Sequence, residues 1–316
     1  MVDSKQQWKA WLYLSPAILL LLIFTVWPIF NTIKIAFLNG YDSYKYLSGD
    51  TFTFGIANFI RVFDRGSSFV NALKTTSILC VITVPVSTLL ALLIAVCLNS
   101  IKFLNRFLQT VFFLPYVTNS IAIGMVFAAM FNIVGTALTS SNPEINSVGI
   151  INNFLGLFGV EPIIWVNDGS TYFHNIIVLI IYIVWNALPF KILILLGGLQ
   201  SVNKQYYDAA KVDGTSRSRV FWRITVPLLS PMIAYVVITG FIGGFKEYSS
   251  VVGVFNEKMT PPGAEPERLQ TMVGFVYQAI LDHKEGRASA AALILFGIIF
   301  AVTLVNLYVS KKKVHY

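Results

Sequence analysis

Six long apolar stretches constrain the fold of this chain more than any other feature of its sequence. They cover approximately residues 12–33, 72–98, 107–131, 174–200, 228–251 and 288–310. Each has close to the roughly 20 residues that an α-helix needs to cross a bilayer core of about 30 Å. Only 12% of the residues are charged, against roughly 25% in soluble domains. The sequence therefore predicts an all-α integral membrane protein with six transmembrane helices, in which residues 1–316 form a single transmembrane domain.

The basic residues are distributed unevenly between the two sides of the membrane. Six spans place both ends of the chain on one side, together with the 201–227 loop. That side carries twelve basic and three acidic residues, whereas the other side carries nine basic and eleven acidic residues. Because loops rich in Lys and Arg stay in the cytoplasm, both termini and this loop are predicted to be cytoplasmic. The formal charge of +8 is thus explained by topology, and no nucleic-acid partner is expected.

The cytoplasmic 201–227 loop has the pattern of two short helices separated by a bend. Asn203 can cap a helix over residues 205–212, which contain good helix formers. Gly214 follows at a position where a left-handed residue commonly ends a helix. A second short helix is expected after it, and Pro227 suits the first turn of the next span. On these grounds alone, an ordinary loop with interfacial helices is an equally good interpretation.

The spacing of residues within this loop resembles a known motif. Asp208-Ala209-Ala210, three further residues, Gly214, nine further residues and Ile224-Thr225-Val226-Pro227 are similar to the EAA loop in the permease subunits of ABC importers. Asp208 stands where that family has glutamate, and Val226 stands where it has leucine. The resemblance implies a helix that docks into a groove of a separate ATPase and passes force between subunits. The residues that it assigns to coupling are Asp208, Ala209, Ala210, Asp213, Gly214, Arg223 and Pro227.

Several polar side chains are predicted to lie within the membrane, where such residues usually face a cavity or a partner. Lys246 and Glu247 fall in the outer half of the fifth span, and adjacent residues of one helix point about 100° apart, so they cannot easily neutralise each other. Lys191 falls in the inner half of the fourth span, from which it can snorkel to the membrane surface, and a structural role is expected for it. Tyr116 and Ser120 share one face of the third span by their i, i+4 spacing. That face suits a sugar, whose apolar CH surface is edged by hydroxyls, or a polar contact between helices.

Three segments that contain these residues resemble the sugar-contacting segments of the larger permease subunit of maltose transporters. They are FFLPYVTNSIAI, WNALPFK and TGFIGGFKEY, in the third, fourth and fifth spans. The residues that the resemblance places on the substrate path are Tyr116, Asn119, Ser120, Ala187, Phe190, Gly240, Gly244, Lys246 and Glu247. Glycine and alanine at several hydrogen-bonding positions of that subunit leave more room and fewer donors here, so maltose specificity is not implied. Lys246 beside Glu247 suits an acidic or amino sugar.

The sequence has none of the motifs that would make this chain an enzyme by itself. It contains no GxxxxGK[ST] phosphate loop, so ATP hydrolysis is not expected of it. It also lacks HExxH and CxxC, and its three histidines are scattered, so neither a metal site nor a catalytic triad is expected. We therefore expect no catalytic residue, cofactor or metal in this chain, and the resemblance places ATP and Mg²⁺ on partner ATPase subunits.

Together these features identify the chain, by resemblance, as a permease subunit of a sugar-type ABC importer with the type I importer transmembrane fold. The resemblance implies alternating access driven by ATP and a location in the cytoplasmic membrane of a bacterium. It also implies, as partners, a second homologous permease, two ABC ATPase subunits, an extracytoplasmic solute-binding protein and membrane lipid. An oligosaccharide is the expected sugar substrate, and a monosaccharide, a polyol or glycerol phosphate remain open.

Two other classes of protein agree with part of the sequence. An ion- or proton-coupled secondary carrier of a small polar solute would account for Lys246 and Glu247. Such carriers usually contain internal repeats with paired broken helices, but no repeat relates residues 1–158 to residues 159–316, and the 201–227 loop would be unexplained. An intramembrane enzyme or an assembly scaffold is the third class, and the lack of an acid–base or metal cluster counts against the enzyme.

Overall fold

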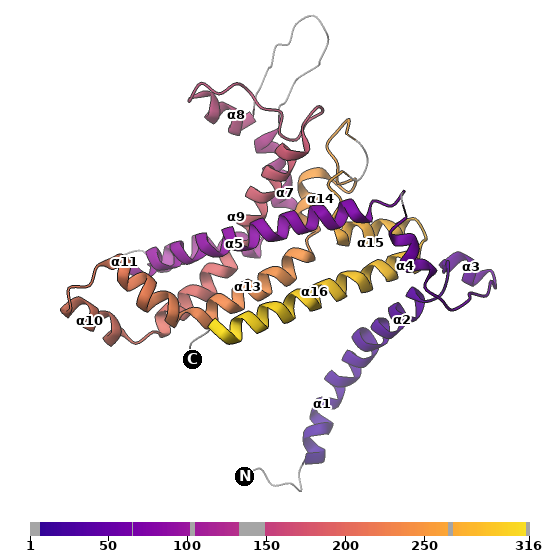
Figure 1. Ribbon diagram of the computed structural model, residues 1–316, viewed down its shortest axis with the longest axis horizontal. Coiled ribbons are helices and arrows are strands. Elements are labelled where there is room, and N and C mark those ends of the chain that lie inside the picture. The colour runs from indigo at the N-terminus through magenta and orange to yellow at the C-terminus, as the bar shows by residue number, and fades with distance from the viewer. Residues whose placement is uncertain (1–6, 65, 102–104, 133–148, 265–267, 314–316) are drawn as a thin grey trace, which may run out of the picture. The chain divides into compact units, whose positions relative to one another are not determined.

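The computed structural model describes residues 7–64, 66–101, 105–132, 149–264 and 268–313 (Figure 1). Within these ranges the secondary structure is helical apart from an isolated antiparallel bridge between Leu38 and Phe54. Four helices there are long and apolar enough to cross a membrane, and two pairs of bent helices raise the number of candidate spans to six. The predicted all-α membrane fold is therefore confirmed. Lys5 and Lys102, which contribute to the predicted charge asymmetry, lie outside the described ranges.

The four unbroken spans extend beyond their apolar stretches at both ends. The first, Trp8–Ala36, combines α1 (Gln7–Leu21), the π-helical turn η2 (Leu22–Val26) and α2 (Trp27–Ala36). The second is α5 (Phe69–Ser100), the fourth is α9 (Tyr172–Ser201) and the sixth is α16 (Glu285–Lys313). Pro85 and Pro189 lie inside α5 and α9 without ending either helix.

The third span consists of two helices. α6 (Asn105–Val117) and α7 (Ser120–Phe131) are bent by 98° at Thr118 and Asn119. Asn119 starts the new helix, because its Oδ1 accepts a hydrogen bond from the backbone N–H of Ile121 at 2.8 Å, as an N-cap does. The break separates Tyr116 from Ser120, so the prediction that these two residues share one face of one helix is wrong.

The fifth span is interrupted at both ends. Its main helix, α13 (Ser230–Phe245), is bent by 68° from α11 (Arg217–Val220), η3 (Phe221–Thr225) and α12 (Val226–Leu228). After α13 ends, a gap of three residues leads to α14 (Ser249–Phe255). The continuous helix predicted over residues 228–251 is therefore wrong at both boundaries. Lys246 and Glu247 lie in the gap between two helices, where they are free of the 100° separation that a helix would impose.

The chain divides into two compact units. Unit 1 comprises residues 1–69 and 275–296, and unit 2 comprises residues 70–274 and 297–316. Unit 1 contains two short helices between the first and second spans, α3 (Ser43–Leu47) and α4 (Ala57–Val62). It also contains most of α15 (Met272–Leu281) and the start of α16.

Unit 2 contains two hydrophobic cores that both use α5 and α9. The first gathers Leu79 and Leu179 with side chains of α7 and α14. The second gathers Leu92, Leu195 and Val236, the last of these from α13. Figure 1 shows α8 (Gly149–Gly156) at one end of unit 2, and α10 (Lys204–Val212) and α11 at another. Between the two cores, α5 and α9 each carry a proline and polar residues, and this level holds the candidate site.

α7 and α14 cross in direct contact at two glycines. A Cβ built on Gly124 would lie 2.7 Å from the Cα of Gly253, and one built on Gly253 would lie 2.9 Å from the carbonyl oxygen of Ile121. Because these neighbours are backbone atoms, rotation of a side chain cannot relieve the contact. The two helices that follow the breaks in the third and fifth spans therefore pack against each other as one body.

We predict that Gly253→Val destabilises unit 2, because the new side chain would overlap the backbone of α7. Overpacking of this kind costs about 1–3 kcal/mol. The apparent melting temperature of the purified protein in detergent is expected to fall. Gly297→Val is the matched control, since a Cβ on Gly297 of α16 meets no atom within 4 Å. Equal losses in the two variants would show that the contact between the glycines is not tight.

Candidate functional site

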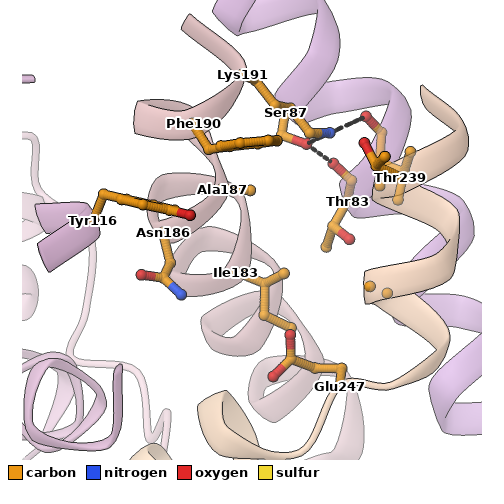
Figure 2. A pocket seen from close by; sticks show the side chains of 14 residues that line it. Thr83, Ser87, Tyr116, Ile183, Asn186, Ala187, Phe190, Lys191, Thr239 and Glu247 are labelled. Carbon is orange, nitrogen blue, oxygen red and sulfur yellow. Dashed lines mark hydrogen bonds between the residues drawn. The ribbon is translucent and has the colours of Figure 1, made fainter. Parts of the chain in front are cut away.

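A cavity of about 310 Å³ lies in unit 2 at the level between the two hydrophobic cores (Figure 2). Its lining comes from α5, α6, α9 and α13, and from the gap before α14. The lining residues are Thr83, Val84, Ser87, Tyr116, Ile183, Asn186, Ala187, Phe190, Lys191, Thr239, Gly240, Gly243, Gly244 and Glu247. The cavity thus lies where α6 and α13 approach their ends and where α5 and α9 carry their prolines.

Lys191 brings a positive charge to this cavity, although its side chain is buried. Its Nζ donates hydrogen bonds to Ser87 Oγ at 2.7 Å, to Thr88 Oγ1 at 2.9 Å and to Val84 O at 3.2 Å, all on α5. These three acceptors match the three N–H groups of an ammonium. Lys191 therefore does not snorkel to the membrane surface, because α5 offers it acceptors inside the protein.

The two hydroxyls that hold Lys191 are arranged to accept from it. Ser87 Oγ donates to Thr83 O at 2.5 Å, and Thr88 Oγ1 donates to Val84 O at 2.7 Å. Each hydroxyl therefore directs its proton to a carbonyl of α5 and keeps a lone pair for the ammonium. Among the described residues, no carboxylate forms an ion pair with Lys191. The hydrogen bonds reduce the cost of burying this charge, and its positive potential is left for the cavity.

Two aromatic rings form another part of the lining. The rings of Tyr116 and Phe190 are stacked, with centroids 5.8 Å apart and planes inclined by 19°. Asn186 lies near them in Figure 2, and its Nδ2 donates to Ser120 Oγ at 3.2 Å. Tyr182 in turn donates to the carbonyl oxygen of Ser120. Two residues of α9 thus hold Ser120 in place. Ser120 does not itself line the cavity, but it accepts a hydrogen bond from Asn186, which does.

Glu247 connects the cavity to the first turn of α14. Its Oε1 accepts hydrogen bonds from the backbone N–H groups of Tyr248 at 3.1 Å and Ser250 at 3.0 Å. In the view of Figure 2, Glu247 and Lys191 lie at opposite ends of the lining. The cavity therefore has a cationic end and an end with carboxylate oxygens. Lys246 is exposed and does not belong to the lining.

The glycines of α13 serve two different purposes. A Cβ on Gly244 would lie 2.7 Å from Cys80 Sγ, and one on Gly240 would lie 3.3 Å from Lys191 Nζ. Both glycines therefore allow α5 and α9 to pack closely against α13, and both also line the cavity. A Cβ on Gly243, which the sequence did not single out, would meet no atom within 4 Å. The open space lies beside Gly243.

Most of the predicted path residues come together in the structure. Those that line the cavity are Tyr116, Ala187, Phe190, Gly240, Gly244 and Glu247, whereas Asn119, Ser120 and Lys246 do not. Sequence reasoning missed Asn186, Thr239 and the α5 residues Thr83 and Ser87. The i, i+4 spacing of these α5 residues within an apolar stretch was a usable signal, because it marks a polar stripe on one helix face.

The predicted coupling residues lie in the segment that joins α9 to α13. Asn203 Oδ1 accepts a hydrogen bond from Gln205 N at 3.0 Å and caps α10, and Gly214 has a φ of +63°. The predicted helix cap and left-handed bend are both present. Tyr207 OH lies 3.4 Å from Thr225 Oγ1 and links α10 to η3. Ala210 is buried, whereas the other candidates on α10 and at its end, Asp208, Ala209, Asp213 and Gly214, are exposed, as is Arg223 on η3. Pro227 lies in α12.

Asp208 and Lys211 form an ion pair of 3.2 Å on the exposed face of α10. Both side chains are exposed, and such pairs are typically worth roughly 0–1 kcal/mol. The pair therefore adds little to the stability of the helix. Asp208 is available to a partner at a small cost.

These observations define a multi-span α-helical membrane protein with a cavity between its helices that has both apolar and polar lining residues. The sequence model of one family, the binding-protein-dependent transport system inner membrane component, matches residues 87–315. The chain belongs to this family. It is therefore a multi-pass membrane permease subunit of an ABC import system, in which the ATPase is a separate protein. This assignment decides against the secondary carrier.

Similar proteins extend over nearly the whole chain. It is 30% identical to the probable ABC transporter permease protein MG188 of Mycoplasma genitalium, over 95% of this chain and 85% of that protein. It is 28% identical to the arabinooligosaccharides transport system permease protein AraP of Bacillus subtilis, over 95% of this chain and 88% of that protein. A bacterial ABC transporter involved in the import of the acidic polysaccharide alginate has a similar structure, with a TM-score of 0.75 at 22% identity, over 98% of this chain and 96% of that one. This likeness confirms the predicted permease fold.

We predict that Lys191→Met is tolerated and that Lys191→Glu is not. Methionine leaves both α5 hydroxyls bonded to their carbonyls, whereas glutamate would point oxygens at the acceptors that now hold Lys191. An uncompensated buried charge costs about 3–5 kcal/mol. Thermal unfolding in detergent should therefore show a small change for Met and a large loss for Glu. A large loss for both variants would mean that the ammonium itself holds α9 against α5.

Proposed function

We propose that this permease subunit imports a carbohydrate, and specifically an oligosaccharide, through the cavity between α5, α6, α9 and α13. The stacked rings of Tyr116 and Phe190 are the observation that carries the proposal. An aromatic surface edged by polar groups complements a sugar, which presents apolar CH faces and hydroxyls. The names of AraP and of the alginate transporter, which refer to an oligosaccharide and a polysaccharide, support the same solute class.

The polar groups around the rings supply contacts for sugar hydroxyls. Asn186 and Thr239 offer an amide and a hydroxyl, and Glu247 offers carboxylate oxygens. Lys191 adds a positive potential that suits an acidic sugar better than an amino sugar. The sequence alone suggests Lys246 as the residue that favours an acidic or amino sugar, but Lys246 lies outside the lining.

The remaining partners follow from the chain's place in a binding-protein-dependent system. A second homologous permease would complete the cavity, two ABC ATPase subunits would bind ATP and Mg²⁺, and an extracytoplasmic binding protein would deliver the solute. The permease makes exposure of the cavity depend on nucleotide state, which is a coupling free energy between two distant surfaces.

The coupling loop has a physical connection to the cavity. Phe221 and Val226 of the loop pack against the second hydrophobic core, which includes Leu195 of α9 and Val236 of α13. Both helices also contribute to the cavity lining. A displacement of α10 by an ATPase would therefore reach the solute site through packed side chains.

The crossed pair of α7 and α14 is well placed to respond to solute. Two cavity residues touch the first turns of these helices, Asn186 through Ser120 and Glu247 through the backbone N–H of Ser250. Because α7 and α14 cross at Gly124 and Gly253, a change at either contact would move both. We infer that α7 and α14 together open and close the end of the cavity that lies away from the coupling loop.

We predict that Tyr116→Ala raises the solute concentration needed for half-maximal uptake several-fold. The substitution removes one ring of the stacked pair, and such contacts are worth roughly 0.5–1.5 kcal/mol. Uptake of labelled oligosaccharides into proteoliposomes that contain the whole transporter measures the effect. Tyr116→Phe is the matched control and should retain uptake, because it keeps the ring. Normal uptake by the Ala variant would remove the sugar-binding surface from the proposal.

We predict that Gly214→Val abolishes ATP-driven uptake although the chain still inserts into the membrane. The φ of +63° at Gly214 costs a β-branched residue roughly 1–2 kcal/mol, so the bend after α10 would change. Gly214→Asn should retain most of the uptake, because asparagine tolerates this conformation. Membrane insertion, ATPase activity and uptake are measured together. Unchanged uptake in the Val variant would contradict the coupling role of the loop.

A further inference from the structure

Unit 1 contains a second cavity, of about 550 Å³, whose lining shares no residue with that of the cavity in unit 2. Its walls come from residues 40–45, from residues 58–67 and from residues 282–287. The charge distribution assigns all three segments to the outer side of the membrane. The first two precede residue 87, where the match to the family model begins.

The segments around this cavity are held together by partly buried hydrogen bonds. Asn58 is 1% exposed, and its Nδ2 donates to Leu38 O at 2.7 Å while its Oδ1 accepts from Gly40 N at 3.1 Å. Ser43 donates from its hydroxyl to Glu285 Oε1 at 2.5 Å, which ties α3 to the first residue of α16. These hydrogen bonds therefore fix the positions of the segments that line the cavity.

The acidic residues of the lining are mostly engaged. Asp42 Oδ1 accepts from the backbone N–H of Tyr44 at 2.9 Å as the cap of α3. Asp282 forms an ion pair of 3.4 Å with Lys284 and accepts from Gln278. Asp64 is the remaining acid of the lining.

A smaller share of the basic side chains than of the acidic side chains in the lining has a hydrogen-bond or ion-pair partner among the described residues. Within the described part of the chain, the side chains of Lys45 and Arg61 have no hydrogen-bond or ion-pair partner. Arg287 donates from Nη2 to Ser67 Oγ at 2.7 Å, and its Cζ lies 5.0 Å from the ring centroid of Phe275. Its buried Nε has no hydrogen-bond partner among the described residues. The free charge at the cavity is therefore positive, and arginines bind carboxylates well.

A neutral donor accompanies these cations. Burial, followed by the neighbouring Tyr46 and Glu285, raises the pKa of Tyr41 above its ordinary value of 10.0. Its phenol therefore stays protonated at physiological pH and can donate to an oxygen.

Exposed aromatic and apolar side chains of α3 lie beside this cavity. Tyr44, Tyr46 and Leu47 on α3 are 61%, 60% and 81% exposed. The ring of Tyr44 packs edge-on against His283, which lines the cavity, at 4.5 Å. Exposed tyrosines around a charged pocket are typical of a surface that binds a protein.

We propose that this cavity is the docking point for an acidic side chain of the solute-binding protein, with α3 as the surrounding contact surface. The proposal rests on the proposed function, because it takes the binding protein as the partner on the outer side. The carboxylate is received by Arg61, Lys45 and Arg287, and the tyrosines of α3 bury apolar surface of the partner. The cavity is separate from the solute path, so it sets the affinity for the binding protein and leaves solute selectivity unchanged.

The test uses the whole transporter in lipid nanodiscs and the fluorescently labelled binding protein of the same system. Arg61→Glu and Lys45→Glu are each expected to raise the dissociation constant by about tenfold without changing the thermal stability, since both side chains are exposed. Lys258→Glu is the matched control, because Lys258 is an exposed residue of the same side that does not line the cavity. A reversed charge at the contacting acid of the binding protein should restore affinity for Arg61→Glu.

The outcomes separate this proposal from the proposed function. Uptake by the wild-type transporter that needs no binding protein would overturn the proposed function. Uptake that needs the binding protein, with Arg61→Glu and Lys45→Glu binding as the wild type does, would overturn the docking proposal alone. Equal losses in Arg61→Glu and Lys258→Glu would also overturn it, because the effect would then follow net charge. Binding of inorganic phosphate at the cavity, with unchanged affinity for the binding protein, would assign the site to a small anion instead.

Discussion

A helix that is interrupted inside a membrane must have its free backbone groups satisfied by protein, because lipid offers no hydrogen bonds. This constraint explains the central level of unit 2. Asn119 supplies the acceptor for the first N–H groups of α7, and Glu247 does the same for α14. Each polar residue makes possible a break in a span, and each break creates an edge of the cavity. The polar groups that a transporter needs for its solute and the groups that its broken helices need are thus partly the same.

The two hydrophobic cores of unit 2 lie on either side of the level that holds the cavity. One core packs the helices beyond the breaks, and the other packs α13 and the residues next to the coupling loop. α5 and α9 run through both cores, and Lys191 joins them at the level between. A transporter that alternates between two exposures needs parts that stay rigid and a level at which they can move. In the proposed transport cycle, the two cores would be the rigid parts, and the level of the breaks and prolines would be where they move.

The two cavities differ in the side chains that line them. The cavity in unit 2 combines stacked rings with a buried cation, and these are the groups proposed to contact the sugar. The cavity in unit 1 is lined by exposed Lys45 and Arg61, whose side chains have no partner among the described residues, and exposed tyrosines of α3 lie beside it. Such a surface can exchange a partner protein without disturbing the membrane spans.

Local sequence patterns predict the membrane class, the approximate spans, and the capped helix and left-handed bend of the coupling loop, and the resemblance of three segments to other permeases adds six of the fourteen residues that line the cavity in unit 2. These features depend on local composition and spacing, such as the apolar stretches, Asn203 before α10 and Gly214 after it. Only the tertiary structure shows where buried charges point and which glycines lie at contacts between helices. Lys191 turns inward because α5 presents three acceptors to it, and Gly244 is small because Cys80 lies against it. Contacts between residues distant in the sequence set these features, and no local pattern contains them.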